Sequence, residues 1–157
     1  MKRRLIGTGA LCRLLQIPLT TLHSWMDKGV LKPSFDVERR HKAFAILPDV
    51  LSAAVGLGLR ASGYEFEQAA RMMKFVQSLS AECIESDFAA GRTLAVMLGP
   101  IVVERLSAPD EVSESKVLAA LVAKTGIKPT VVDVRRVYEN ILAKLEAEPE
   151  REPVSAG

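Results

Sequence analysis

Residues Thr8–Pro33 read TGALCRLLQIPLTTLHSWMDKGVLKP. In the first half of this run, apolar side chains from Ala10 to Ile17 recur at helical spacing, with Arg13 on the opposite side. Pro18 lacks a backbone N–H and has a fixed φ, so it ends one helix and suits the first position of the next. The pattern predicts two short helices joined by a tight turn.

The second predicted helix has an apolar stripe and a polar outer face. Leu22, Trp25 and Met26 recur at i, i+3 and i+4 and are expected to pack inward. Gly29 follows as a left-handed cap, and Pro33 keeps the helix from resuming. The residues expected outward or at the edge are Thr20, Thr21, His23, Ser24, Asp27 and Lys28. Two helices so arranged form a helix-turn-helix, whose second helix fits a DNA major groove.

The run Ile17–Pro33 resembles the winged helix-turn-helix of MerR-type regulators and of excisionase-like proteins. The likeness is carried by Thr21, Leu22, Trp25, Gly29, Leu31 and Pro33. A second run, LRASGYEF at Leu59–Phe66, is similar to the link between the third and fourth helices of that family. The resemblance therefore covers Leu5–Val76, about half of the chain.

The resemblance implies that the second helix enters the major groove and that the next segment forms a wing against the phosphate backbone. Where the family's wing usually carries Gly-Tyr-Arg, this chain has ERRHKAF at Glu38–Phe44, which keeps positive charge there. Carried over by position, the DNA-facing residues are Thr20, Thr21, His23 and Ser24 on the helix and Arg39, Arg40, His41 and Lys42 on the wing. Lys28 and Lys32 are added as phosphate contacts, because such contacts require only positive charge near the surface.

Some of these assignments have alternatives. The His23 side chain can hydrogen-bond a base or a phosphate, or can simply be solvated on the surface. The hydroxyls of Thr20 and Thr21 can cap the start of the helix instead of contacting DNA. The sequence leaves both pairs of alternatives open.

Positive charge is concentrated in the N-terminal part of the chain. Residues 1–60 hold ten Lys and Arg against four Asp and Glu, a net charge of +6, whereas the remainder has a net charge of −4. Nucleic-acid affinity comes largely from cations that replace counterions on phosphates, so a local excess matters more than the overall +2. The charge distribution predicts that the N-terminal part binds DNA.

The next predicted helix is Leu47–Leu59, which begins with a proline and an acidic residue, as the first turn of a helix tolerates and favours. The run Gly56–Ala61 matches a G-x-G-x-x-A dinucleotide-binding fingerprint. That fingerprint works when it follows a strand and opens a helix, whereas here it follows a helical pattern. We therefore expect a loop between helices at this run, and no cofactor.

The segment Glu65–Ala90 has no proline or glycine, which fits one long helix or two consecutive helices broken near Ser78–Ser80. In MerR-type proteins the corresponding helix often pairs with its twin to make a dimer. The resemblance thus implies a seam made by Met72, Met73, Val76 and Leu79. The same apolar stripe can instead close the core of a single chain.

Farther along, two apolar runs flank a Gly-Pro pair, at Thr93–Leu98 and Ile101–Leu106. They predict a β-hairpin, with a short buried helix as the alternative. After a polar connector, a helix is expected at Ser115–Lys124, with Gly126 just past its end.

Thr130 and Asp133 resemble a capping box, so a last helix is expected to run from there to about Ala147. Its apolar side chains step by three and four, which makes a second candidate dimer seam. The residues of that seam are Val131, Val134, Tyr138, Ile141 and Leu145. The acidic, proline-containing Glu148–Gly157 is expected to be a disordered tail.

Composition and motifs limit the other classes of function. With 48% hydrophobic and 25% charged residues, the chain has the composition of an ordinary soluble protein. Arg13 interrupts the first apolar run before it reaches signal-peptide length, and no run approaches the roughly 20 uncharged apolar residues of a membrane span, so the chain is expected to be cytoplasmic. No nucleophile elbow, P-loop or zinc-protease motif occurs, so we do not expect an enzyme. Cys12 and Cys83 are expected to be small buried hydrophobic residues, and a lone thiol near the predicted dimer helix is too few soft ligands for a metal sensor.

We therefore predict a mainly α protein with a winged helix-turn-helix in residues 1–78, a helical dimerisation or effector region with a possible hairpin in 79–147, and a tail in 148–157. The expected function is that of a MerR-like transcriptional regulator that binds double-stranded DNA as a homodimer, without cofactor or metal. One alternative is an excisionase-like or DNA-packaging adaptor. Another is a protein-interaction module that has lost DNA binding. The sequence does not indicate a particular small-molecule effector.

Overall fold

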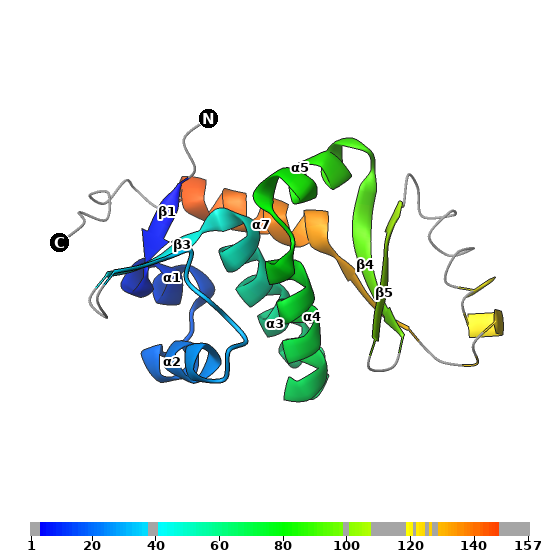
Figure 1. Ribbon diagram of the computed structural model, residues 1–157, viewed down its shortest axis with the longest axis horizontal. Helices are drawn as coiled ribbons and strands as arrows, with labels where there is room; N and C mark the ends of the chain where they lie inside the picture. The colour runs from blue at the N-terminus through cyan, green and yellow to red at the C-terminus, as the bar shows by residue number, and fades with distance from the viewer. Residues whose placement is uncertain are drawn as a thin grey trace.

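The computed structural model describes residues 4–37, 41–98, 101–107, 119–120, 122–124, 126 and 129–147. Within them the chain is mainly helical, with two small antiparallel sheets. Figure 1 shows a central group of helices with one sheet on each side, and the first two helices of the chain beside the left-hand sheet. Three predicted features lie outside the described residues. They are the tail at 148–157, most of the helix at 115–124, and the wing residues Arg39 and Arg40.

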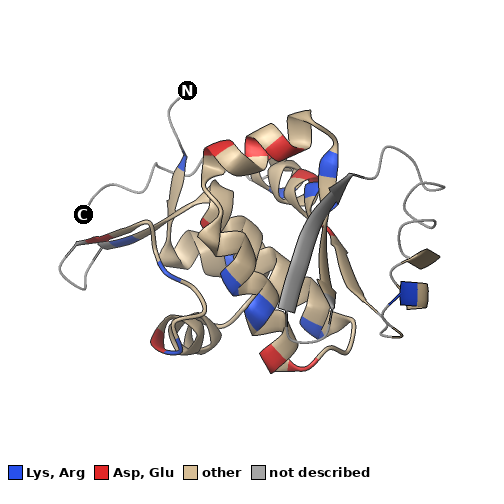
Figure 2. Ribbon diagram, turned by 45° about the vertical axis from the view of Figure 1, so that its right-hand side comes forward, with Lys and Arg blue, Asp and Glu red and all other residues tan. Residues whose placement is uncertain are grey.

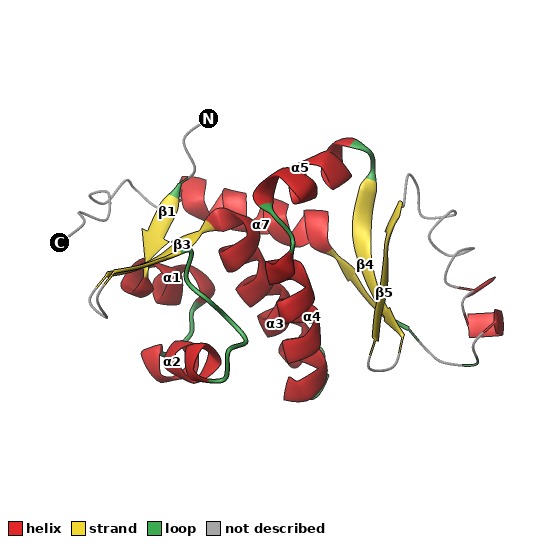
Figure 3. Ribbon diagram, in the orientation of Figure 1, coloured by secondary structure: helices red, strands yellow, loops and turns green. Residues whose placement is uncertain are grey.

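The first elements follow the pattern of Thr8–Pro33. A short strand, β1 (Leu5–Gly7), leads into α1 (Thr8–Leu15) and α2 (Leu19–Asp27). The strands β2 (Phe35–Val37) and β3 (His41–Ala45) then pair as an antiparallel hairpin, and β3 lies between β2 and β1 in the sheet. The prediction of two short helices is confirmed, and the segment that follows them is a β-hairpin (Figure 3).

The central helices come next in the chain. The segment η1 (Ile46–Val50), in which Leu47 is extended with φ of −115° and ψ of 125°, leads directly into α3 (Leu51–Ala61). The following helices are α4 (Phe66–Ser78), which packs along α3, and α5 (Ala81–Ala89). Of the two alternatives for residues 65–90, two consecutive helices is therefore the one observed.

Local side chains explain where these helices begin. Glu65 and Gln68 form a capping box at the start of α4. The Ser80 hydroxyl accepts a hydrogen bond from the Cys83 backbone N–H at 3.1 Å, which caps α5. These caps favour the start of a new helix at Phe66 and at Ala81.

The predicted loop at Gly56–Ala61 is wrong, because this run lies inside α3 and the chain turns only after it. A Cβ atom added at Gly56 would overlap the Met73 Sδ atom, so the glycine permits the close approach of α4. The glycine at this position therefore serves helix packing, which a local sequence pattern does not reveal.

The second sheet contains the predicted C-terminal hairpin. It is formed by β4 (Arg92–Leu98) and β5 (Ile101–Ser107), so the hairpin is confirmed over the alternative of a buried helix. A third strand, β6 (Thr130–Asp133), pairs antiparallel with the other edge of β4. α5 and the last helix, α7 (Val134–Ala147), both contact β4.

The predicted start of the last helix is wrong. Thr130–Asp133 forms strand β6, because its two valines pair with β4 in the sheet. α7 begins immediately after the strand, and the Asp133 Oδ1 atom accepts a hydrogen bond from the Arg136 backbone N–H at 3.0 Å. Asp133 therefore caps the helix, and Thr130 does not.

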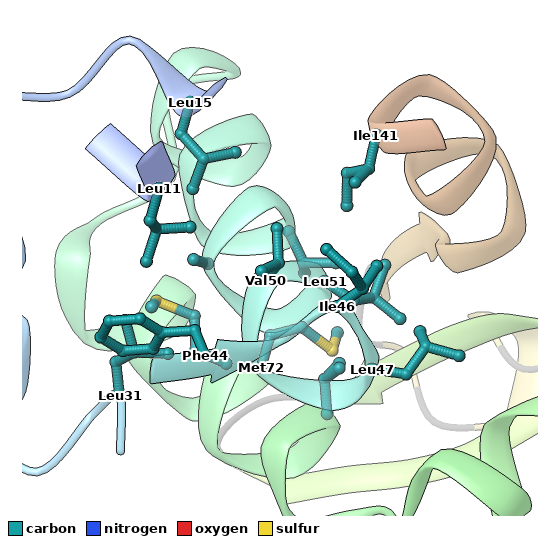
Figure 4. Close-up of a cluster of buried hydrophobic side chains, with 14 of the residues drawn as sticks. Leu11, Leu15, Leu31, Phe44, Ile46, Leu47, Val50, Leu51, Met72 and Ile141 are labelled. Carbon is teal, nitrogen blue, oxygen red and sulfur yellow. The ribbon is translucent and has the colours of Figure 1, made fainter. Parts of the chain in front are cut away.

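A single hydrophobic core extends across the molecule. Figure 4 shows side chains of α1, β3, α3, α4 and α7 that meet in it, among them Leu11, Phe44, Met72 and Ile141. The same cluster reaches Met97 on β4. The regions 1–78 and 79–147 thus share one core at the predicted boundary between them.

The predicted dimer seams lie in this core. Met72, Met73 and Val76 on α4 are at most 1% exposed, since α3 packs against α4. The other seam residues are the buried Val134, Ile141 and Leu145, the half-buried Leu79 and Tyr138, and the half-buried Val131 on β6. The expectation that the buried members face a second chain is therefore corrected, and for α4 the alternative holds that its stripe closes the core of one chain.

Candidate nucleic-acid interface

α2 presents a polar face that the rest of the described chain leaves uncovered. On its inner side Leu22 is 0% and Trp25 5% exposed, as the helical spacing predicts. On its outer side Thr20 and His23 are exposed, and Thr21 and Ser24 are half-buried at the edge. The four residues predicted to face DNA from this helix therefore lie together on its accessible side.

The turn that precedes α2 fixes the angle between the two helices. Gln16 adopts a left-handed conformation with φ of 56°, and the Ile17 backbone N–H donates to the Cys12 carbonyl at 3.0 Å. Pro18 occupies the N-cap position of α2 and no side chain caps the helix. Thr20 and Thr21 lie in the first turn of the helix, so the alternative that they cap it does not hold.

The end of α2 is set by Gly29, which has the expected left-handed conformation with φ of 68°. The Val30 backbone N–H then donates to the Trp25 carbonyl at 2.9 Å, which turns the chain back toward the core. The Lys28 ammonium lies 4.5 Å from the centroid of the Phe66 ring at the start of α4. Lys28 remains exposed, but its charge is directed toward α4.

The β2–β3 hairpin is buried at the end of β3, half-buried at Lys42 and Ala43, and exposed at Phe35 and Asp36 of β2. Phe44 is fully buried on β3, whereas Phe35 on β2 is 56% exposed. Asp36 pairs with Lys42, which is half-buried. The predicted wing residues Arg39 and Arg40 and the side chain of His41 fall outside the described residues. In the chain, residues 38–40 connect the paired ends of the two strands.

A buried carboxylate that the sequence patterns did not identify holds the hairpin and the α2–β2 loop in place. Asp49, 3% exposed, accepts hydrogen bonds at its Oδ2 atom from the Ser34 backbone N–H at 3.0 Å and from the Ala45 backbone N–H at 2.9 Å. The Ser34 hydroxyl donates to the same oxygen. Asp49 thus joins the loop before β2 to the last residue of β3.

The other carboxylate oxygen of Asp49 connects this cluster to α4. The Gln77 side-chain amide donates to Asp49 Oδ1 at 3.0 Å and to the Lys32 carbonyl at 2.6 Å. In return, the Lys32 backbone N–H donates to Gln77 Oε1 at 2.9 Å. The Lys32 side chain is exposed on a backbone that Gln77 holds from both sides. The only sequence signal for this cluster is an acidic residue in the first turn of a helix.

Charge differs between α5 and the N-terminal elements of the described structure. Figure 2 shows acidic positions along α5, at the top of the view. The N-terminal elements instead carry more exposed cations than exposed carboxylates, with Asp27 and Asp36 against Arg4, Arg13, Lys28, Lys32 and Arg60. An excess of cations on one part of a surface favours the binding of a polyanion there.

An open cleft of about 720 Å³ lies between the α3–α4 link and the second sheet. It is lined by the link at Ser62–Tyr64, by β6, and by polar side chains that include Arg136 and Asn140 of α7. No residue predicted to face DNA lines it. The cleft is therefore distinct from the surface formed by α2 and the hairpin.

The two cysteines lie half-buried on α1 and α5, as small apolar residues do. Burial raises the pKa of the Cys12 thiol, and the nearby Arg13 guanidinium offsets this only in part. Cys12 is therefore a protonated thiol at neutral pH. Among the described residues, no cluster of three or more His, Cys, Asp or Glu side chains is arranged to hold a metal ion.

Comparison with known proteins gives no family for this chain. No family model matches it, and no curated protein matches it. Within the described part of the chain, no helix combines the length and the apolar character needed to cross a membrane. Function is therefore inferred from the geometry of α2 and its surroundings.

Proposed function

We propose that this protein is a sequence-specific DNA-binding regulator, with α1, α2 and the β2–β3 hairpin acting as a winged helix-turn-helix. In this arrangement α2 enters the major groove, and the hairpin with the residues that connect its strands contacts the phosphate backbone.

The observation that carries the proposal is the accessibility of the outer face of α2. Leu22 and Trp25 fix the helix to the core, and Thr20 and His23 stay exposed on the opposite side. A recognition helix must project such a face, because side chains covered by the same chain cannot reach base edges. Figure 1 adds that α2 and the hairpin lie at the same end of the molecule.

The charge distribution supports the same surface. Residues 1–60 carry a net charge of +6. Half of their ten Lys and Arg fall in the short segment from the end of α2 into β3, namely Lys28, Lys32, Arg39, Arg40 and Lys42. Cations that contact phosphates supply affinity and orientation, whereas the polar side chains of α2 supply sequence preference.

We also propose that the protein acts as a homodimer, whose interface lies on a surface other than the buried stripes of α4 and α7. A dimer with two-fold symmetry reads two half-sites and selects a palindrome. A chain that binds alone selects a single half-site. The symmetry of the bound sequence therefore reports the state of the protein on DNA.

The test is selection of bound sequences from a random DNA pool with the purified chain, followed by affinity measurements on the enriched duplex and on a scrambled duplex. We expect enrichment of one motif, and a scrambled duplex bound at least about tenfold more weakly. Ser24→Ala and His23→Ala should change the enriched motif. Ser86→Ala, on the exposed side of α5, is the matched control and should leave it unchanged.

Other outcomes separate the alternatives. Binding without sequence preference, or no binding at low salt, contradicts the proposal, and the second result favours a protein-interaction module. Footprinting on the promoter region of its own gene, followed by a transcription assay, distinguishes a regulator from an excisionase-like or DNA-packaging adaptor, since only a regulator changes transcription from the bound site.

A further inference from the structure

We infer that Leu19, at the start of α2, reads the C5-methyl groups of thymine, so that the preferred half-site contains A·T base pairs. This inference rests on the proposed function and names the chemistry by which α2 discriminates between bases.

The residue composition of α2 excludes the commonest base contacts. The helix reads LTTLHSWMD and contains no Arg, Lys, Asn or Gln. Arg and Lys are the usual partners of guanine, and Asn and Gln are the usual partners of adenine, because these side chains match the donor and acceptor pattern of each base edge. The one carboxylate, Asp27, is a partner type for cytosine but is the last residue of α2, whereas the N-terminal residues of a recognition helix are those that contact base edges. The N-terminal part of α2 must therefore discriminate by hydroxyl, imidazole and apolar contacts.

Leu19 is the apolar group placed to do so. It is 49% exposed, whereas Leu22, on the inner side of the same helix, is 0% exposed. Leu19 is the first residue of α2, and the N-terminal residues of a recognition helix are those that contact base edges. The exposed Thr20 beside it adds a methyl and a hydroxyl group.

Thymine is the base that fits this surface. It alone carries a methyl group in the major groove, and apolar side chains contact that group. A leucine placed against guanine or cytosine would cover their polar edges without a partner, which is unfavourable. The exposed apolar start of α2 therefore favours thymine over the other bases.

The test uses the duplex that the wild-type chain enriches from a random pool. Each thymine is replaced in turn by uracil, which removes the methyl group and keeps the base pairing. We expect the wild-type affinity to fall about fourfold at one or two positions in each half-site, the value for burial of one methyl-sized group. At those positions Leu19→Ala should bind the thymine and uracil duplexes equally well.

The matched control is Leu142→Ala on α7, where the leucine is 37% exposed. This variant should keep the full preference for thymine. Leu19→Met is a second variant, which keeps an apolar contact and should keep most of the preference. Thermal unfolding followed by circular dichroism confirms that each variant is folded, as their exposed positions lead us to expect.

Two kinds of contrary result are distinguishable. If the wild-type chain enriches a motif but uracil costs nothing at any position, or Leu19→Ala keeps the penalty, this inference is overturned and the proposed function stands. If the wild-type chain enriches no motif, the proposed function fails and this inference fails with it.

Discussion

In the sheet β5–β4–β6, four consecutive residues of the central strand, Leu94–Met97, are at most 3% exposed, so both faces of β4 are covered. In the sheet β1–β3–β2, burial among the described side chains of the central strand is confined to its last residues, Phe44 and Ala45. The two sheets have the same number of strands and the same antiparallel pairing. The described centre of β4 is thus part of the core, whereas β3 is buried only at its last residues.

The cause of the difference lies in what packs against each sheet. β4 is contacted by two helices, α5 and α7, whereas β1 and β3 are contacted by α1. β3 is followed directly by η1, whose buried Ile46 and Leu47 pull the end of the strand into the core. β2 holds Phe35 and Asp36, both exposed. A projecting strand pair of this kind is suited to binding rather than to stability.

The largest expected effect compares two phenylalanines in the anchored sheet. Phe44→Ala should lower the free energy of unfolding by about 3–5 kcal/mol, because it leaves a cavity in the core. Phe35→Ala, at a residue 56% exposed, should change it by no more than about 0.5 kcal/mol. Urea denaturation of both variants measures this. Equal losses of unfolding free energy would show that Phe35 packs against the rest of the protein as Phe44 does.

The next effect concerns the cluster that fixes the hairpin to the body of the protein. Asp49→Asn should lower the free energy of unfolding by about 2–3 kcal/mol, since an amide nitrogen cannot accept the hydrogen bonds that a carboxylate oxygen accepts. Asp36→Asn, on the exposed strand β2, is the matched control and should have an effect within about 0.5 kcal/mol. An unchanged midpoint in urea for Asp49→Asn would contradict the role assigned to this carboxylate.

The smallest effect tests the contact between α3 and α4, which lie between the two sheets. Gly56→Ala should be destabilising by about 1–3 kcal/mol, because the new Cβ would meet the buried Met73 side chain. Gly58→Ala, on the same helix with no atom within 4 Å of the new Cβ, should instead stabilise by about 0.5–1 kcal/mol. Thermal unfolding of both variants checks the sign of each effect. A stabilising Gly56→Ala would mean that the helices are farther apart.

The parts of the fold that local patterns encode could be predicted from the sequence. The spacing of Leu22 and Trp25, the proline at 18 and the glycine at 29 are enough to place α2 and its inner face. The Gly-Pro pair between two β-branched runs is enough to predict the hairpin of β4 and β5. In each case the signal lies within a few residues of the element it specifies.

The failures involve contacts between distant residues. Thr130–Asp133 fits a capping box as well as a strand, and pairing with β4 decides between them. The apolar stripe of α4 does not reveal its partner, which is α3 of the same chain. Asp49 bonds to Ser34 and Gln77, which are 15 and 28 residues away, so no local pattern indicates the cluster.

The proposed function depends most on the placement of the DNA surface at α2 and the hairpin. The direct measurement is the dependence of affinity for the enriched duplex on salt concentration. It compares the wild-type chain with two double variants, Arg39→Ala/Arg40→Ala at the hairpin and Arg135→Ala/Arg136→Ala on α7. The first double variant should reduce the slope of log affinity against log salt by roughly 2, since each phosphate that a cation neutralises adds about 0.9, and the α7 pair should leave it unchanged. An unchanged slope for the hairpin variant, or an equal reduction for the α7 variant, would contradict this placement.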